Sequence, residues 1–159
     1  QGRKIEKGNK AIWEPIEAVV SSMQGGGLNL ETMHAGGLCG MATFLDPSIT
    51  TSDNLSGQVV ARKGDLPEIH NTVSIEVNLM EKMVAGDGEA PEKIQPLRNN
   101  EMLMLNVATA TSVGVTRNAE KGRTDLDLRL PICADKGQRI SLSRRIGSRW
   151  RLIGYGTIV

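Results

Sequence analysis

Aromatic residues are scarce in this chain of 159 residues, which contains one Phe, one Tyr and two Trp. A core built without aromatic rings must use Val, Ile, Leu and Met, and these residues suit many short strands packed as a barrel. The same scarcity argues against a stacking platform for nucleic-acid bases. We therefore expect a β-rich protein with an aliphatic core.

Cysteine and histidine are equally sparse, with two of each in the whole chain. Cys39 and Cys133 lie far apart and His34 and His70 are isolated, so no group has the ligand spacing of a zinc site. Neither histidine stands in a motif of a nucleophilic triad, and both are expected on the surface or in loops. We expect both cysteines to be free buried thiols in a reducing compartment.

Nucleotide motifs and membrane segments are also missing. The dipeptide Gly-Lys does not occur, so the chain has no P-loop of the form Gly-x4-Gly-Lys-Ser/Thr. Gly25-Gly26-Gly27 lacks a strand-to-helix setting and is interpreted as a loop. No apolar run reaches the roughly 18 residues of a membrane span, and none resembles a secretion signal. These absences predict a cytoplasmic protein with no membrane partner.

Alternation of apolar and polar residues marks the strongest predicted strands. Thr72–Leu79 and Thr124–Ile132 both follow a period of two, so their apolar residues, Leu130 among them, are expected on one buried face. Turn clusters recur between such runs, for example at Arg62–Asp65 and at Gly86-Asp87-Gly88. This recurrence favours a barrel or sandwich over an alternation of helices and strands.

The C-terminal stretch Arg139–Val159 combines two β-type runs around Gly147-Ser148 and is predicted to form a hairpin. From Lys136 to Arg151 there are six basic residues and no acidic one, although the net charge of the chain is only +1. A contact surface is one reading of this run. The other is a solvated hairpin whose arginines pair with carboxylates elsewhere, such as Asp125 and Asp127. Trp150, within the run, fits either a barrel-core position or a contact.

A domain boundary fits best near Ala61 to Pro67. Here a predicted strand, Gly57–Ala61, gives way to charged residues, Gly and Pro. The second piece, 65–159, is long enough for a closed six-stranded barrel, whereas the first, 1–64, is short for one. A short helical turn is predicted within Ser48–Asn54.

Six blocks of sequence carry a family resemblance. They are Ala35–Gly40, Leu45–Pro47, Ser56–Ala61, Asn106–Gly114, Pro131–Ala134 and Ser143–Gly156. Together they resemble the gamma subunit of archaeal and eukaryotic translation initiation factor 2, and the similarity extends over essentially the whole chain. Two positions depart from the family pattern. Arg62-Lys63-Gly64 stands where relatives usually have Lys-Pro-Gly, which should loosen the linker, and Ala108 stands where they tend to have Gly.

The resemblance implies an all-β fold of two successive β-barrels of the elongation factor Tu domain II and III type. Residues 1–64 would be the second half of domain II, so the first barrel is N-terminally incomplete, and residues 65–159 would be domain III. The family's P-loop, switch regions and zinc knuckle would lie upstream of Gln1. We therefore expect a fragment or processed product with no catalytic residue, metal or cofactor of its own, GTP and Mg²⁺ belonging to the absent GTPase domain.

The function that the resemblance implies is delivery of methionyl initiator tRNA to the small ribosomal subunit, in the GTP state, with alpha and beta subunits as partners. Domain II would dock the alpha subunit and help to hold the aminoacylated 3′ end. The terminal hairpin would face the GTPase domain. Arg144, Arg145 and Arg149 are candidates for interdomain contacts first and tRNA phosphate contacts second. Arg151 and Lys136 in the same basic run are further candidates.

Two alternatives remain open. The barrels of another translational GTPase, of the selenocysteine-specific or elongation factor 1A type, would have similar strands, although an end at Tyr155–Val159 argues against the former. A stand-alone β-barrel enzyme would need an acid/base site in a pocket, and the sequence shows none.

Overall fold

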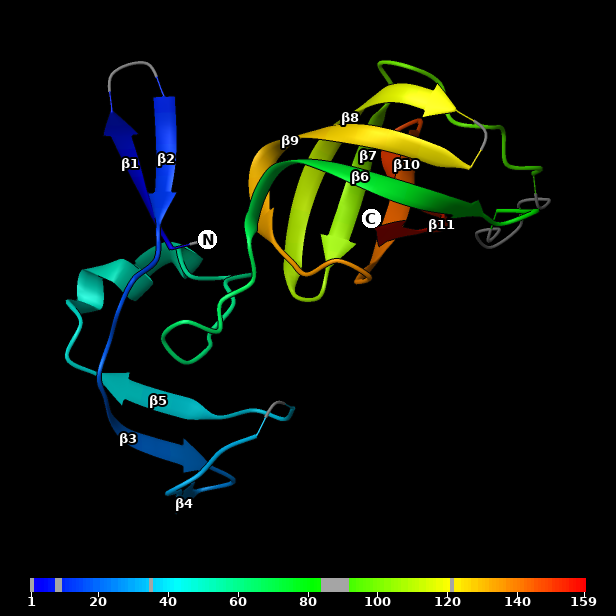
Figure 1. Cartoon of the computed structure of the whole chain (residues 1–159). Coiled ribbons are helices and arrows are strands. Elements are labelled where there is room, and N and C mark those ends of the chain that lie inside the picture. Colours follow the sequence, from blue (N-terminus) through cyan, green and yellow to red (C-terminus); the bar gives the residue numbers. More distant parts are fainter. Residues whose placement is uncertain (1, 8–9, 35, 84–91, 121) are drawn as a thin grey trace. The chain divides into compact units, whose positions relative to one another are not determined.

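The computed structural model describes residues 2–7, 10–34, 36–83, 92–120 and 122–159. The chain divides into two compact units, Gly2–Leu55 and Ser56–Val159 (Figure 1). Strands dominate both, and the one helical element of the described residues is a short 3₁₀ helix. The expected all-β class is confirmed. No helix in the described part of the chain has the length and apolar composition needed to span a bilayer. The turn predicted at Gly86-Asp87-Gly88 lies outside the described residues.

The N-terminal unit consists of two small antiparallel sheets and the 3₁₀ helix. The first sheet is a hairpin of two strands, and the second has the strand order β4-β3-β5. The elements are β1 (Arg3–Lys7), β2 (Lys10–Glu14), β3 (Val20–Gly25), β4 (Leu28–Asn29), β5 (Gly40–Thr43) and η1 (Pro47–Asp53). The predicted glycine loop is a tight turn between β3 and β4, where Gly26 and Gly27 have φ angles of 58° and 79°.

The helical turn predicted within Ser48–Asn54 is confirmed as η1, which begins one residue earlier. Pro47 occupies its first turn, and the Asp46 carboxylate accepts a hydrogen bond of 2.8 Å from the backbone N–H of Ser48. This cap stabilises an N–H group that has no partner inside the helix. The same hydrogen bond lowers the pKa of Asp46 below its usual value.

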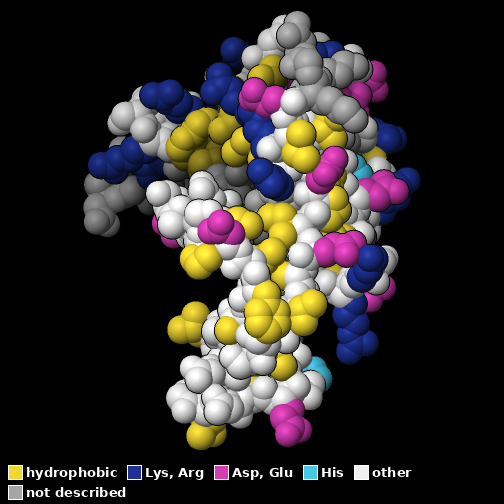
Figure 2. Space-filling view, turned by 90° about the vertical axis from the view of Figure 1, so that its left-hand side faces the viewer, with side chains coloured by type: hydrophobic (Ala, Val, Ile, Leu, Met, Phe, Trp, Pro, Cys, Tyr) yellow, Lys and Arg dark blue, Asp and Glu magenta, His cyan; other side chains and the backbone are white. Residues whose placement is uncertain are grey.

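No side chain of the N-terminal unit whose burial the structure describes is buried. Leu28, Leu38 and Phe44 expose 69%, 95% and 81% of their surface, and hydrophobic side chains (yellow) stand at the surface in Figure 2. Two- and three-stranded sheets of this size are too small to enclose a core. The assignment of this unit to half of a domain II barrel stays a prediction.

The C-terminal unit contains the predicted closed barrel of six strands, which is confirmed. The strands follow one another around the barrel in the order β10-β11-β6-β9-β8-β7 (Figure 1), and all neighbours are antiparallel. They are β6 (Ile69–Leu79), β7 (Met102–Val107), β8 (Ala110–Glu120), β9 (Arg123–Cys133), β10 (Arg139–Ile146) and β11 (Arg149–Ile158).

The barrel interior is aliphatic, as the scarcity of aromatic residues predicts. Its fully buried large side chains come from every strand of the barrel except β8, which contributes smaller ones. They are Ile75, Leu103, Leu105, Leu126, Ile132, Ile140, Leu142 and Ile153. Burying one such side chain contributes about 1.5–3 kcal/mol, so these eight supply much of the driving force that closes the barrel.

The alternation in Thr124–Ile132 predicts a buried Leu130, and this prediction is wrong. Leu126 and Ile132 are fully buried, but Leu130 is 51% exposed. The pairing of β9 with β6 is irregular between His70 and Thr72, whose partners are Ile132 and Asp127. Extra residues of β9 therefore bulge out of the ladder, and a bulge reverses which face a side chain takes.

The strand predicted over Gly57–Ala61 is also absent. Gly57 lies in a turn, and the residues after it are irregular. A strand persists where a neighbouring strand accepts and donates its backbone hydrogen bonds. Among the described residues, none pairs with this segment as a strand. The turn predicted at Arg62–Asp65 is present, with a 3.0 Å hydrogen bond from the Asp65 N–H to the Arg62 carbonyl.

Candidate contact surface on the terminal hairpin

The predicted terminal hairpin is confirmed as β10 and β11, joined at Gly147-Ser148. Gly147 has a φ angle of 59°, which favours glycine at this turn. The register pairs Ile146 with Arg149 next to the turn. Between Leu142 and Ser143 the pairing shifts by one residue, and the extra residue, Ile153, is fully buried. The bulge thus adds one more side chain to the core of the barrel.

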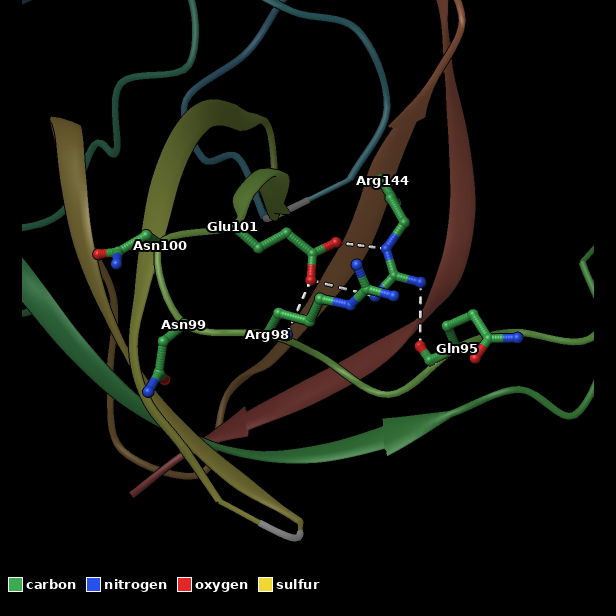
Figure 3. Close-up of a pocket in the computed structure, with 6 residues that line it drawn as sticks. All are labelled: Gln95, Arg98, Asn99, Asn100, Glu101 and Arg144. Carbon is green, nitrogen blue, oxygen red and sulfur yellow. Dashed lines mark hydrogen bonds and ion pairs between the residues drawn. The ribbon is translucent and has the colours of Figure 1, made fainter.

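Arg144 is bound inside the barrel unit. Its Nε donates to Oε1 of Glu101, and its Nη2 donates to Oε2 at 3.1 Å. The same guanidinium donates to the carbonyl of Gln95 at 2.9 Å (Figure 3) and to that of Pro96 at 3.2 Å. The side chains of Arg144 and Glu101 are only 16% and 17% exposed. Because β10 neighbours β7 in the barrel, this fork ties the segment before β7 to the hairpin.

Arg145 and Arg149 have different surroundings from Arg144. Both are exposed, and none of the described residues forms a hydrogen bond or ion pair with either guanidinium. Arg145 stands opposite Trp150 in the register, on the other face of β10 from Arg144. The structure therefore places close to the tip of the hairpin two cations that have no partner in the described part of the chain.

The other two candidates differ again. Arg151 is half-buried and stands opposite Arg144. Lys136 is exposed in the turn before β10, at the far end of the hairpin from Gly147. An eight-residue strand is about 23 Å long, so Lys136 lies far from Arg145 and Arg149, which stand next to the turn of the hairpin.

Arg139 also lies at the far end of the hairpin, and its Cζ is 5.2 Å from the centroid of the Tyr155 ring. This distance is within the range of a cation–π interaction. Trp150 is half-buried and outside the buried core cluster. The sequence allowed either a barrel-core position or a contact for Trp150. The barrel-core position is wrong, because the register puts Trp150 on the same face as the exposed Arg145.

The suggestion that Asp125 and Asp127 face the arginines of the hairpin is wrong. Strand β9 lies between β6 and β8, so the cation beside Asp127 is Arg117 of β8. Asp125 accepts a hydrogen bond of 2.5 Å from the Ser74 hydroxyl and another from the Asn118 amide. These hydrogen bonds favour the charged carboxylate and lower its pKa.

Both cysteines are free thiols, and His70 binds a backbone carbonyl. Cys133 is buried and donates from Sγ to the Pro67 carbonyl at 3.1 Å, and burial raises the pKa of its thiol. Cys39 is exposed, so the expectation of a buried thiol is wrong there. His70 hydrogen-bonds through Nε2 to the Ala134 carbonyl at 3.0 Å. Within the described ranges, no cluster of three His, Cys, Asp or Glu could hold a metal ion.

Sequence reasoning missed the residues that surround Arg144. Arg98, Asn99, Asn100 and Glu101 precede β7 and line a pocket of about 430 Å³ together with Gln95 and Arg144. None of them belongs to an alternating run or a known motif. The one local signal was Glu101, a single acidic residue directly before a strand. It does not identify Arg144 as its partner, because Arg144 lies 43 residues away.

Comparison with known proteins identifies the family. Residues 71–158 match the family described as Initiation factor eIF2 gamma, C terminal. Similar curated proteins are the translation initiation factor 2 subunits gamma of Methanococcus aeolicus, 50% identical, Methanocaldococcus jannaschii, 48% identical, and Haloarcula marismortui, 43% identical. Each match covers 99% of this chain and 38% of the relative. The chain thus spans less than two fifths of the length of these relatives, and it belongs to the family of initiation factor eIF2 gamma C-terminal domains.

Proposed function

We propose that this chain is the C-terminal barrel region of a translation initiation factor 2 gamma subunit. In this proposal the whole protein, with alpha and beta subunits, carries methionyl initiator tRNA to the small ribosomal subunit in the cytoplasm. GTP and Mg²⁺ would bind to a GTPase domain outside this sequence, and the region itself would act as a binding module. Support comes from the family match and from relatives with that name that align over 99% of the chain.

We further propose that Arg145 and Arg149 are the main contact residues of the hairpin. The observation that carries this proposal is their exposure without a partner in the described chain, whereas Arg144 donates four hydrogen bonds within the barrel. A guanidinium without an intramolecular acceptor can bind a carboxylate or phosphate in two places without first breaking a bond. Of the two possible partners, we rank another domain of the subunit first and a tRNA phosphate second.

The experiment replaces Arg145 and Arg149 with Ala in the full-length gamma subunit. We expect thermal unfolding to show weaker coupling between the barrels and the GTPase domain, or initiator tRNA affinity to fall. If the lost contacts are to phosphates, the dependence of log Kd on log salt concentration should become shallower by about 0.7–0.9 for each contact.

A matched control is Arg129→Ala, which removes an exposed arginine from β9, outside the hairpin. This variant should leave both tRNA affinity and domain coupling unchanged. If the double variant behaves like the control in both measurements, the contact role of the hairpin is wrong.

A further inference from the structure

The pocket at the start of β7 has an unequal balance of charge. Two arginines, Arg98 and Arg144, and a single carboxylate, Glu101, line its volume of about 430 Å³ (Figure 3). The remaining lining residues, Gln95, Asn99 and Asn100, are neutral amides. The pocket therefore has an excess of one positive charge and several polar groups that can donate hydrogen bonds.

Glu101 cannot neutralise both arginines, because its oxygens already have donors. Arg144 donates to both oxygens, and the backbone N–H of Arg98 donates to Oε2 at 3.0 Å. The Arg98 guanidinium, by contrast, has no hydrogen-bond acceptor or ion-pair partner among the described residues. Its five N–H donors are available to a molecule that enters the pocket.

The backbone of the pocket is held in place by β8. Asn100 N–H donates to the Thr116 carbonyl at 2.8 Å, and Glu101 N–H donates to the Thr116 hydroxyl at 2.8 Å. The Asn99 side chain accepts a hydrogen bond of 2.6 Å from the backbone N–H of Ala119. Because these contacts hold the segment 99–101, little backbone entropy is lost when a ligand binds there.

We propose that this pocket is a binding site for an oxyanion, a phosphate or carboxylate group, held by the Arg98 guanidinium. The neighbouring Arg144 guanidinium adds positive potential, while its own hydrogen bonds remain with Glu101. Arginine suits this role because its planar fork matches both anions. The volume leaves room for part of the molecule that carries the anion. This site is separate from the contact proposed for Arg145 and Arg149, because it depends on neither residue.

The test is an NMR titration of the 159-residue chain with sodium phosphate and, separately, with sodium acetate, both against sodium chloride at equal ionic strength. Phosphate or acetate should shift the Arg98 side-chain signal and the amide signals of residues 98–101 in a saturable way. The stronger of the two responses identifies the anion class. Arg98→Gln should weaken the binding by about tenfold or more, because the charged donor is lost.

Two further variants make the result decisive. Arg98→Lys keeps the charge but loses the fork, and should bind more weakly than the wild-type chain. Arg129→Gln removes an exposed arginine outside the pocket and should bind as well as the wild-type chain. The Arg98 side chain is exposed and forms no hydrogen bond or ion pair with the described residues, so its variants are expected to fold, and an unchanged amide spectrum outside the pocket will show this. The proposal would be overturned if the anion shifted the signals of all exposed arginines. It would also be overturned if the shifts in Arg98→Gln were the same as in the wild-type chain.

Discussion

The Arg144 guanidinium donates to both oxygens of Glu101 and to two backbone carbonyls, with both side chains less than a fifth exposed. In such a part-buried pair, removing one partner leaves the other charge with unsatisfied donors or acceptors. The pair therefore stabilises this end of the barrel and contributes little to the charge exposed on its surface. Arg145, the next residue, points to the other face of the strand and has no partner among the described residues.

Replacing Glu101 with Gln is expected to lower the free energy of unfolding by about 1.5–3 kcal/mol, because charge-assisted hydrogen bonds to Arg144 are lost. Urea denaturation of the chain measures this change. Glu76→Gln, at an exposed position on β6, is the control and should change stability by less than about 0.5 kcal/mol. Equal stability of the two variants would contradict the structural role of the pair.

Ala108 adopts a φ angle of 51° in the turn between β7 and β8. This left-handed conformation is unfavourable for a residue with a Cβ atom and is readily adopted by glycine. The departure noted in the sequence, Ala where relatives tend to have Gly, therefore has a conformational consequence. It affects the turn more directly than the packing of the strands.

Ala108→Gly is expected to stabilise the chain by about 1 kcal/mol, since relief of the left-handed strain exceeds the entropy that glycine adds to the unfolded state. The midpoint of thermal or urea unfolding measures the gain. Ala119→Gly within β8 is the matched control, because Ala119 does not have a positive φ angle. That control should destabilise by about 0.5–1 kcal/mol. A destabilised Ala108→Gly variant would refute the strain argument.

Strand β11 depends on two glycines for its close packing against β6. A Cβ atom at Gly154 would lie 2.2 Å from the carbonyl oxygen of Asn78, and one at Gly156 would lie 2.7 Å from Cδ1 of Ile75. The Gly-Tyr-Gly sequence at positions 154–156, part of the family resemblance, therefore has a packing explanation. The small residues face β6, and Tyr155 between them is exposed.

Gly154→Ala should destabilise the barrel by about 3 kcal/mol, because the clash is with backbone and the two strands must move apart. Gly114→Ala in β8 is the comparison, since the three atoms nearest to its Cβ would belong to side chains, the closest at 3.2 Å. Chemical denaturation of both variants should show the larger loss for Gly154. A smaller loss at Gly154 than at Gly114 would show that β11 and β6 separate easily.

Local pattern predicts an element well where one face of a strand is buried and its pairing is regular. Residues Thr72–Leu79 meet this condition, and the strand predicted there is confirmed. The terminal hairpin is confirmed as well, although its register shifts between Leu142 and Ser143. The pattern fails in β9, because the irregular pairing with β6 exposes Leu130. It fails at Gly57–Ala61 as well, because an extended segment needs a neighbouring strand that the sequence does not specify.

In the molecule as a whole, the two units differ in how far they bury apolar side chains. The unit Ser56–Val159 encloses an aliphatic core within a closed barrel, which leaves its sheet without edges. The described residues of Gly2–Leu55 form small open sheets with exposed apolar side chains. The chain also covers only 38% of the length of its relatives.

The amino-acid sequence was sufficient for the all-β class, for most strands of the barrel and for the family, because alternation and motif are local properties of the chain. The roles of the arginines in the hairpin are not local. Arg144 and Arg145 are adjacent in sequence, yet one binds a carboxylate 43 residues away and the other has no partner among the described residues. The order of strands in the barrel brings β10 next to β7 and Glu101 next to Arg144. Only that long-range pairing distinguishes Arg144, which binds within the barrel, from the candidate contact residues.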